Sequence, residues 1–178
     1  ATDTGLKIIT NSNRNIFMLW SDPDPNYTVK YAFALDGAND PSGTDWDPSC
    51  VIIGTDLNGG LITDEIGRHS TMAVDGSAVF ITFGNWTTPG EKLWFGYTPD
   101  GTKLGLTASD WSFKTVVINK KVKYSSIAVS RSRQVHISYY DTTGGTENLW
   151  YAFCDDASGN GANDASFNNS IVASSGTN

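Results

Sequence analysis

The feature that most constrains the fold of this chain is a sequence segment of two short strand-like runs, which occurs three times. The clearest copy, YSSIAVSRSRQVHISYYD, begins at Tyr124, and a second, HSTMAVDGSAVFITFGN, begins at His69. A more divergent copy, GLKIITNSNRNIFMLWSD, begins at Gly5. The second and third units repeat with a period of about 56 residues, and the first unit is longer. A period of this size predicts a repeat architecture with one supersecondary unit per repeat.

Each unit contains four strand-like runs. The first run reads KIIT, TMAV or SIAV, and the second reads IFMLW, VFITF or VHISYY. The third reads VKYAF, LWFGY or LWYAF, and the fourth is a Val/Ile run after a repeated aromatic, Trp46, Trp111 or Phe167. The second runs alternate with period 2, and their other face is only partly polar. Such strands must be covered on both faces.

The repeat predicts an all-β fold, a β-propeller made of three four-stranded antiparallel blades in a single unit spanning 1–178. Blade boundaries are expected at about 5–62, 67–119 and 123–178. A β-sandwich is the alternative, but sandwiches rarely repeat in register. A small residue recurs in the third run, at Ala32, Gly96 and Ala152, which suits a close approach of neighbouring blades. The repeated aromatics, with Trp94 and Trp150, are expected to hold blades together.

Three blades are too few for a closed ring, since propellers typically close with four to eight. We therefore expect half of a six-bladed ring, completed by a second chain or by a missing segment. The chain begins with Ala, which indicates processing or a fragment. Cys50 and Cys154 are either two buried thiols or one disulfide, and in a two-chain ring a disulfide between chains is conceivable.

Composition narrows the classes of partner. The net charge is −7 and the sequence pI is about 4.6, so an acidic surface disfavours nucleic acid. No apolar run approaches the roughly 18 residues that a membrane helix needs. Low Lys content with many Asn, Ser, Thr and Gly residues favours an extracellular, secreted protein.

The third unit, YSSIAVSRSRQVHISYYD followed by LWYAF, resembles the repeat of secreted sialidase-like (BNR-like) β-propellers. The resemblance is close in the third unit, partial in the second and faint in the first. It implies a blade type, and many propellers of this kind bind or cleave glycans. The family's Asp-box turn, S-x-D-x-G-x-x-W, is absent here, which argues against the enzyme reading.

Ligands of propellers usually meet the face formed by the loops that follow the second run and precede the first. These loops and their surroundings supply the candidate ligand-binding residues Asp22, Asp24, Asn85, Trp86, Asp141, Arg68 and His69. Asp22, Asn85 and Asp141 occupy equivalent positions, where such residues often cap a turn instead. Trp86 is either a binding platform or a loop anchor.

The loops between the third and fourth runs are acidic, and oxygen-rich loops can bind Ca²⁺. Their candidate metal ligands are Asp36, Asp40, Asp155, Asp156 and Asp164. The alternative is a pair of solvated loops, and no other cofactor is implied. His69 and His136 fall in different units and do not form a metal pair. A mid-strand His136 is expected to be packed and hydrogen-bonded.

These patterns favour a non-catalytic extracellular β-propeller binding module with glycan as the candidate ligand. The first alternative is a structural subunit that assembles through open blade edges into a filament, sheath or particle. The second is a glycoside hydrolase of sialidase-like architecture, which needs a pair of suitably spaced carboxylates. A sialidase also needs an arginine cluster, and of the four arginines only Arg68 falls on the ligand face.

Overall fold

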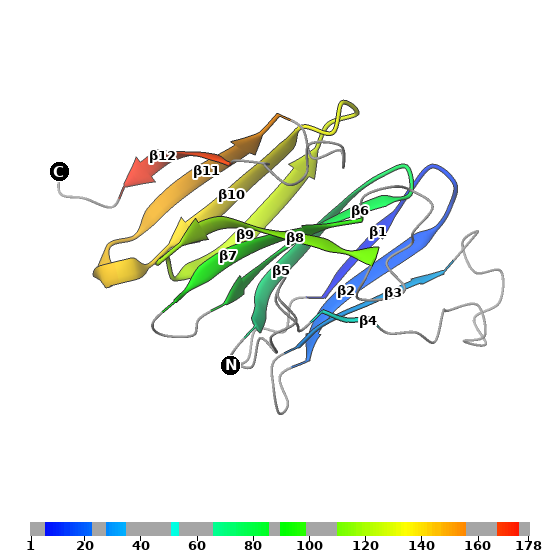
Figure 1. Cartoon of the computed structure of the whole chain (residues 1–178), viewed down its shortest axis with the longest axis horizontal. Coiled ribbons are helices and arrows are strands. Elements are labelled where there is room, and N and C mark those ends of the chain that lie inside the picture. The colour runs from blue at the N-terminus through cyan, green and yellow to red at the C-terminus, as the bar shows by residue number, and fades with distance from the viewer. Residues whose placement is uncertain are drawn as a thin grey trace.

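The computed structural model describes residues 6–22, 28–34, 51–53, 66–85, 90–98, 110–155 and 167–174. They form three separate four-stranded antiparallel sheets, and each sheet is built from one repeat of the sequence. Figure 1 shows the sheets layered in chain order, with the green second sheet between the blue first sheet and the yellow-to-red third sheet. The expectation of an all-β chain with four strands per repeat is confirmed, and the three sheets do not close into a ring.

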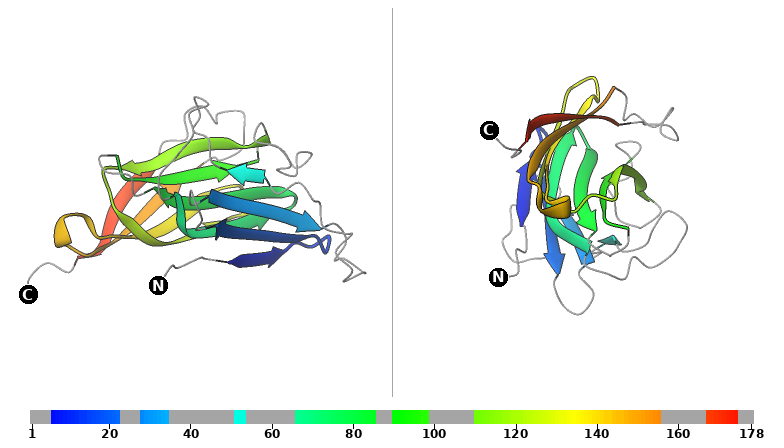
Figure 2. Two further views of the ribbon diagram at one scale, coloured as in Figure 1. Left: turned by 90° about the horizontal axis from the view of Figure 1, so that it is seen from below. Right: turned by 90° about the vertical axis from the view of Figure 1, so that its left-hand side faces the viewer.

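Strand order within each sheet follows the chain. The first sheet contains β1 (Lys7–Thr10), β2 (Ile16–Asp22), β3 (Thr28–Ala34) and β4 (Val51–Ile53). The second contains β5 (Ile66–Asp75), β6 (Ala78–Asn85), β7 (Lys92–Tyr97) and β8 (Ser112–Ile118). The third contains β9 (Val122–Val129), β10 (Val135–Asp141), β11 (Asn148–Cys154) and β12 (Asn168–Ser174). Figure 2 shows β1 and β4 at opposite margins of the first sheet.

The second sheet is covered on both faces, which explains its apolar strands. One face packs on the first sheet in a cluster that includes Phe17, Tyr31, Ile81 and Trp94. Its other face packs on the third sheet through a second cluster, which includes Phe80, Phe95, Ile137 and Tyr139. All eight residues of β6 are buried. In β10, buried and half-buried residues alternate, as period 2 predicts.

Two of the repeated aromatics bridge neighbouring sheets. The ring of Trp111 meets Tyr31 of the first sheet edge-on, with centroids 5.4 Å apart. Phe167 meets Phe95 of the second sheet in the same way, at 5.3 Å. Tyr31 and Phe95 occupy equivalent positions of β3 and β7. The predicted role of these aromatics in holding units together is therefore confirmed for Trp111 and Phe167, while Trp46 lies outside the described residues.

The absence of a side chain at Gly96 was expected to allow close approach of a neighbouring sheet, but the structure gives another reason. A Cβ on Gly96 would lie 2.6 Å from Cε1 of Phe113 and 3.0 Å from Cγ1 of Ile81. Phe113 is the direct partner of Gly96 on β8, in the same sheet. The missing side chain therefore makes room for an aromatic ring of its own sheet. That ring in turn packs in the seam, meaning the packed boundary between two neighbouring sheets, that joins the second sheet to the first.

Cys154 is buried in the cluster between the second and third sheets. Its side chain therefore faces the second sheet and not the outer face of the third, where another chain would have to approach. This position argues against the disulfide between chains that the sequence left open. Cys50 lies outside the described residues.

Among the residues that the structure describes, no helix has the length and hydropathy needed to cross a membrane.

Candidate functional site

Three of the candidate ligand residues end the second strand of their sheets. Asp22 pairs with Thr28, Asn85 with Lys92 and Asp141 with Asn148, so their predicted equivalence is confirmed. Asn85 and Asp141 are both buried, with Asp141 only 1% exposed. Asp24 and Trp86 lie outside the described residues, so their proposed ligand roles remain predictions.

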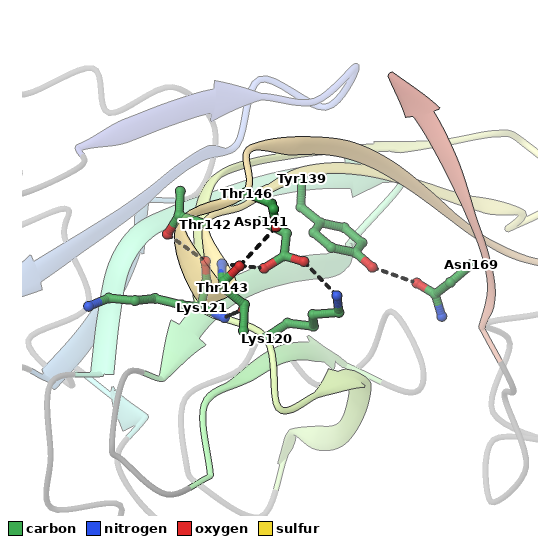
Figure 3. A network of polar contacts seen from close by, with 8 residues as sticks. All are labelled: Lys120, Lys121, Tyr139, Asp141, Thr142, Thr143, Thr146 and Asn169. Atoms are coloured by element: carbon green, nitrogen blue, oxygen red, sulfur yellow. Dashed lines mark hydrogen bonds and ion pairs between the residues drawn. The ribbon is translucent and has the colours of Figure 1, made fainter. Parts of the chain in front are cut away.

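Asp141 is held by two partners at the end of β10 (Figure 3). Its Oδ1 accepts a hydrogen bond of 2.9 Å from the backbone N–H of Thr143, the turn-capping arrangement typical of an Asp at a strand end. Its Oδ2 lies 2.7 Å from Nζ of Lys120, which comes from the connection between β8 and β9. The carboxylate thus links that connection to the turn that contains the 3₁₀ segment Thr143–Gly145.

The charge state of Asp141 follows from these contacts. Burial alone raises its pKa, but the hydrogen bonds from Lys120 and Thr143 and the charge of Lys120 outweigh burial and lower the pKa below its ordinary value. A general acid in glycoside hydrolysis needs the opposite shift. Asp141 is therefore an ionised structural carboxylate in this geometry and is poorly suited to donate a proton.

Lys120 also contacts a pair of aromatic side chains, Trp150 and Tyr139, in the seam between the second and third sheets. Its Nζ lies 4.9 Å from the ring centroid of Trp150, a cation–π distance. Trp150 stacks on Tyr139 with centroids 6.2 Å apart and rings inclined by 3°. The hydroxyl of Tyr139 donates to Oδ1 of Asn169 at 3.1 Å. Burial and the nearby Asp141 charge raise the pKa of Tyr139, so its hydroxyl remains neutral and available as a donor.

Replacing Lys120 by methionine is expected to lower the free energy of unfolding by about 1–2 kcal/mol at neutral pH, because a buried carboxylate loses its cationic partner. The partial exposure of Lys120, 30%, keeps this cost below that of a fully buried pair. Asp141 has a lowered pKa in the fold, so its contribution is present above the unfolded pKa and is lost as the pH falls through the folded value.

The difference between wild type and Lys120→Met should therefore shrink as the pH falls below about 4 and through the lowered pKa of Asp141, because below that pKa both forms carry a protonated Asp141. Urea unfolding at several pH values measures this. Lys121→Met is the matched control, since it removes a charge from the neighbouring lysine while the backbone bonds of Lys121 to the turn are kept. A deficit that is the same at every pH would contradict the assigned ion pair.

A second group of residues lies on the first strands of the second and third sheets. The rings of His69 on β5 and Tyr124 on β9 are 4.4 Å apart, although the residues are separated by about one repeat. Both have a left-handed backbone, with φ of 58° and 52°. Each sits at a register shift of its strand, where a bulge can redirect a side chain. Tyr124 is 64% exposed.

The chain holds this pair in place with polar contacts across the seam. Oγ of Ser125 donates to the backbone carbonyl of His69 at 3.1 Å, and it lies 2.9 Å from Oγ1 of Thr82. A left-handed backbone is an outlier for a residue as bulky as tyrosine and costs roughly 1–3 kcal/mol where it persists. Such strain at two equivalent positions indicates that the surrounding structure enforces the placement of both rings.

The other sequence candidates have mixed outcomes. Arg68 lies on β5 opposite Gly84, one residue from the His69–Tyr124 pair. Asp155 is exposed after β11 and accepts a long hydrogen bond of 3.5 Å from Gln134. Among the residues that the structure describes, no group of three or more His, Cys, Asp or Glu side chains could hold a metal ion. The remaining candidate calcium ligands, Asp36, Asp40, Asp156 and Asp164, lie outside those residues, and a calcium site there stays a prediction.

Two expectations about packed residues are confirmed. His136 is half-buried, with Nδ1 2.6 Å from the hydroxyl of Tyr151. Trp94 is buried in the first seam and Trp150 packs against the second. Sequence reasoning did not single out Lys120, although its loop, NKKVK from Asn119, was assigned to the same face as the strand end that carries Asp141. Comparison with family models gives no match to this chain, and none of the curated proteins matches it.

Proposed function

We propose that this chain is a non-catalytic binding module, part of a secreted β-propeller, and that the His69–Tyr124 pair contributes to a glycan-binding surface. The exposed ring of Tyr124, held in a left-handed backbone against His69, is the observation that carries the proposal. Exposed aromatic faces are amphipathic and suit the C–H faces of sugar rings, while nearby polar groups orient the ligand.

The propeller part of the proposal is supported by three sheets of one strand order that pack face to face. The pair lies near the ends of β6 and β10, where the loops after the second strands begin: Arg68 pairs with Gly84, and Lys123 pairs with Tyr140. In a propeller this is the end where ligands usually bind. The resemblance to sialidase-like repeats and the polar composition support a secreted, glycan-binding protein.

A glycan array followed by titration of the best-bound glycan tests this function. Tyr124→Gly removes the ring and suits the left-handed backbone, so the fold is retained while affinity for the glycan should fall about tenfold or more. Tyr124→Phe keeps the stacking face and should bind nearly as well as wild type. Ile171→Ala, which removes an exposed apolar side chain from β12 at the opposite edge of the sheet from β9, is the control. Equal affinity of Tyr124→Gly and wild type, or an array without any bound glycan, would contradict the proposal.

The alternative of a structural subunit has its own support in the outward faces of the first and third sheets. Ile8 on the first sheet is 62% exposed and Leu149 on the third sheet is 37% exposed, so each outward face leaves an apolar side chain in contact with water. Assembly through these faces and glycan binding are compatible with each other. The hydrolase alternative is weakened because the lowered pKa of Asp141 and its pairing with Lys120 make it unsuitable as the general acid that this chemistry needs.

A further inference from the structure

The register of the two central strands is the same in all three sheets. Met18 pairs with Ala32, Ile81 with Gly96 and Ile137 with Ala152. At the next position on the same face, Trp20 pairs with Lys30, Phe83 with Trp94 and Tyr139 with Trp150. Each residue of these central strands therefore has an equivalent in the other two sheets, and the environments of equivalent residues can be compared directly.

The two seams inside the chain use opposite faces of successive sheets. The face of the first sheet that carries Phe17, Leu19 and Tyr31 packs on the second sheet. The equivalent face of the second sheet, which carries Phe80 and Phe95, packs on the third. Each seam thus joins one kind of face to the other kind, which is a heterologous, head-to-tail arrangement. Within the part of the chain that the structure describes, one face of each kind is left without a covering sheet.

The uncovered face of the first sheet, called the leading face, carries Ile8, Ile16, Met18, Trp20 and Lys30. Its equivalents in the other sheets are fully buried: Val79, Ile81, Phe83, Val135, Ile137 and Tyr139 are all 0% exposed. On the leading face, Ile16, Met18 and Trp20 are only half-buried, and Ile8 is 62% exposed. The side chains are therefore of the type that a seam buries, but they remain partly in water.

The uncovered face of the third sheet, called the trailing face, carries His136, Ser138, Leu149, Tyr151 and Phe153. Its apolar and aromatic members match seam residues, since Leu149 is equivalent to the fully buried Leu93 and Val29. Leu149 is 37% exposed. Tyr151 and Phe153 are half-buried and stack on each other, with ring centroids 6.5 Å apart.

We propose that a second copy of this chain covers both faces, with the leading face of each copy packed on the trailing face of the other. The surface complementary to each face is present on the chain itself, as the two internal seams demonstrate. Two copies supply six sheets, which lies within the range of four to eight at which propellers close. A heterologous contact that closes gives a ring and not an open filament. The pairing does not depend on glycan binding.

Sedimentation velocity and native mass spectrometry across a range of protein concentrations test the pairing. The expected particle is a dimer, with no larger species at high concentration. A chain that stays monomeric throughout would overturn the proposal and would indicate that further sheets of a longer polypeptide cover the faces. A ladder of polymers would overturn the closed ring.

Two charge substitutions identify which faces meet. Ile8→Glu alters the leading face and Leu149→Glu the trailing face, both at exposed positions where the fold of each copy should persist. In a head-to-tail ring each variant alone damages both seams, so each should shift the dimer dissociation constant by at least about a hundredfold. Arg131→Glu, in the exposed turn between β9 and β10, is the matched control and should leave the dimer intact.

Mixing the two variants separates this arrangement from a symmetric one. The mixed dimer combines one damaged seam with one seam of two unaltered faces, so mixing should restore part of the dimer population. If like faces met instead, one of the variants alone would leave the dimer intact, and that result would overturn the proposal. Circular dichroism melting of each variant at low concentration confirms that its fold is retained.

Discussion

Replacing Leu93 by alanine is expected to lower the free energy of unfolding by about 3–4 kcal/mol. Leu93 lies on β7 and is fully buried in the seam between the second and third sheets. Truncation leaves a cavity between two sheets, each already packed against other residues, so neither can collapse easily to fill it. Urea unfolding measures the loss.

Leu149→Ala is the matched control for this substitution, because it deletes the same atoms at the equivalent position of the third sheet. Leu149 is 37% exposed, so its truncation should cost about 1 kcal/mol or less at concentrations where the chain is monomeric. Equal losses at the two positions would contradict the assignment of one face to a seam and the other to solvent.

Gly96→Ala is expected to destabilise the fold by about 2–3 kcal/mol, a large cost for the addition of one methyl group. The new Cβ would lie 2.6 Å from Cε1 and 2.8 Å from Cδ1 of Phe113. Phe113 cannot move freely, because its ring stacks on Trp111 and meets Phe83 edge-on. Thermal or urea unfolding of the variant measures the cost.

A second substitution makes this prediction specific to Phe113. Phe113→Leu in the Gly96→Ala background removes the clashing ring edge, so the methyl group should cost much less there than in the wild-type background. Ala152→Gly, at the equivalent position of the third sheet, should cost about 1 kcal/mol. Additive effects of Gly96→Ala and Phe113→Leu would show that the methyl group is not opposed by this ring.

Strand content was predictable because each strand carries its pattern locally. In β10, Val135, Ile137 and Tyr139 are fully buried as their alternation predicts. The pattern of β6, apolar on both faces, predicted a sheet covered on both sides, and every residue of β6 is buried. The same logic assigned Trp111 and Phe167 to the contacts between units, because a residue that recurs in each repeat serves what all repeats share.

The candidate site was harder to predict, since its contacts join distant parts of the chain. The sequence placed Asp141 at the end of its strand, but the ion pair with Lys120 depends on how the turn between β8 and β9 folds over that end. His69 was a candidate from its loop. The repeat placed Tyr124 at the equivalent position of the next unit, but the contact between the two rings and the left-handed backbone of both residues arise from bulges in two sheets.

By itself, the sequence determined three units of four antiparallel strands, because hydrophobic alternation and turn residues act within a few neighbours. It also predicted that the second strands of all three units are covered on both faces, which the structure shows for the middle unit. Only the tertiary structure decided which face of each sheet is covered and which remains open, because covering depends on the rotation of one sheet onto the next. The same packing joins His69 to Tyr124 and Lys120 to Asp141, since both contacts cross between segments that only the stacked sheets bring together.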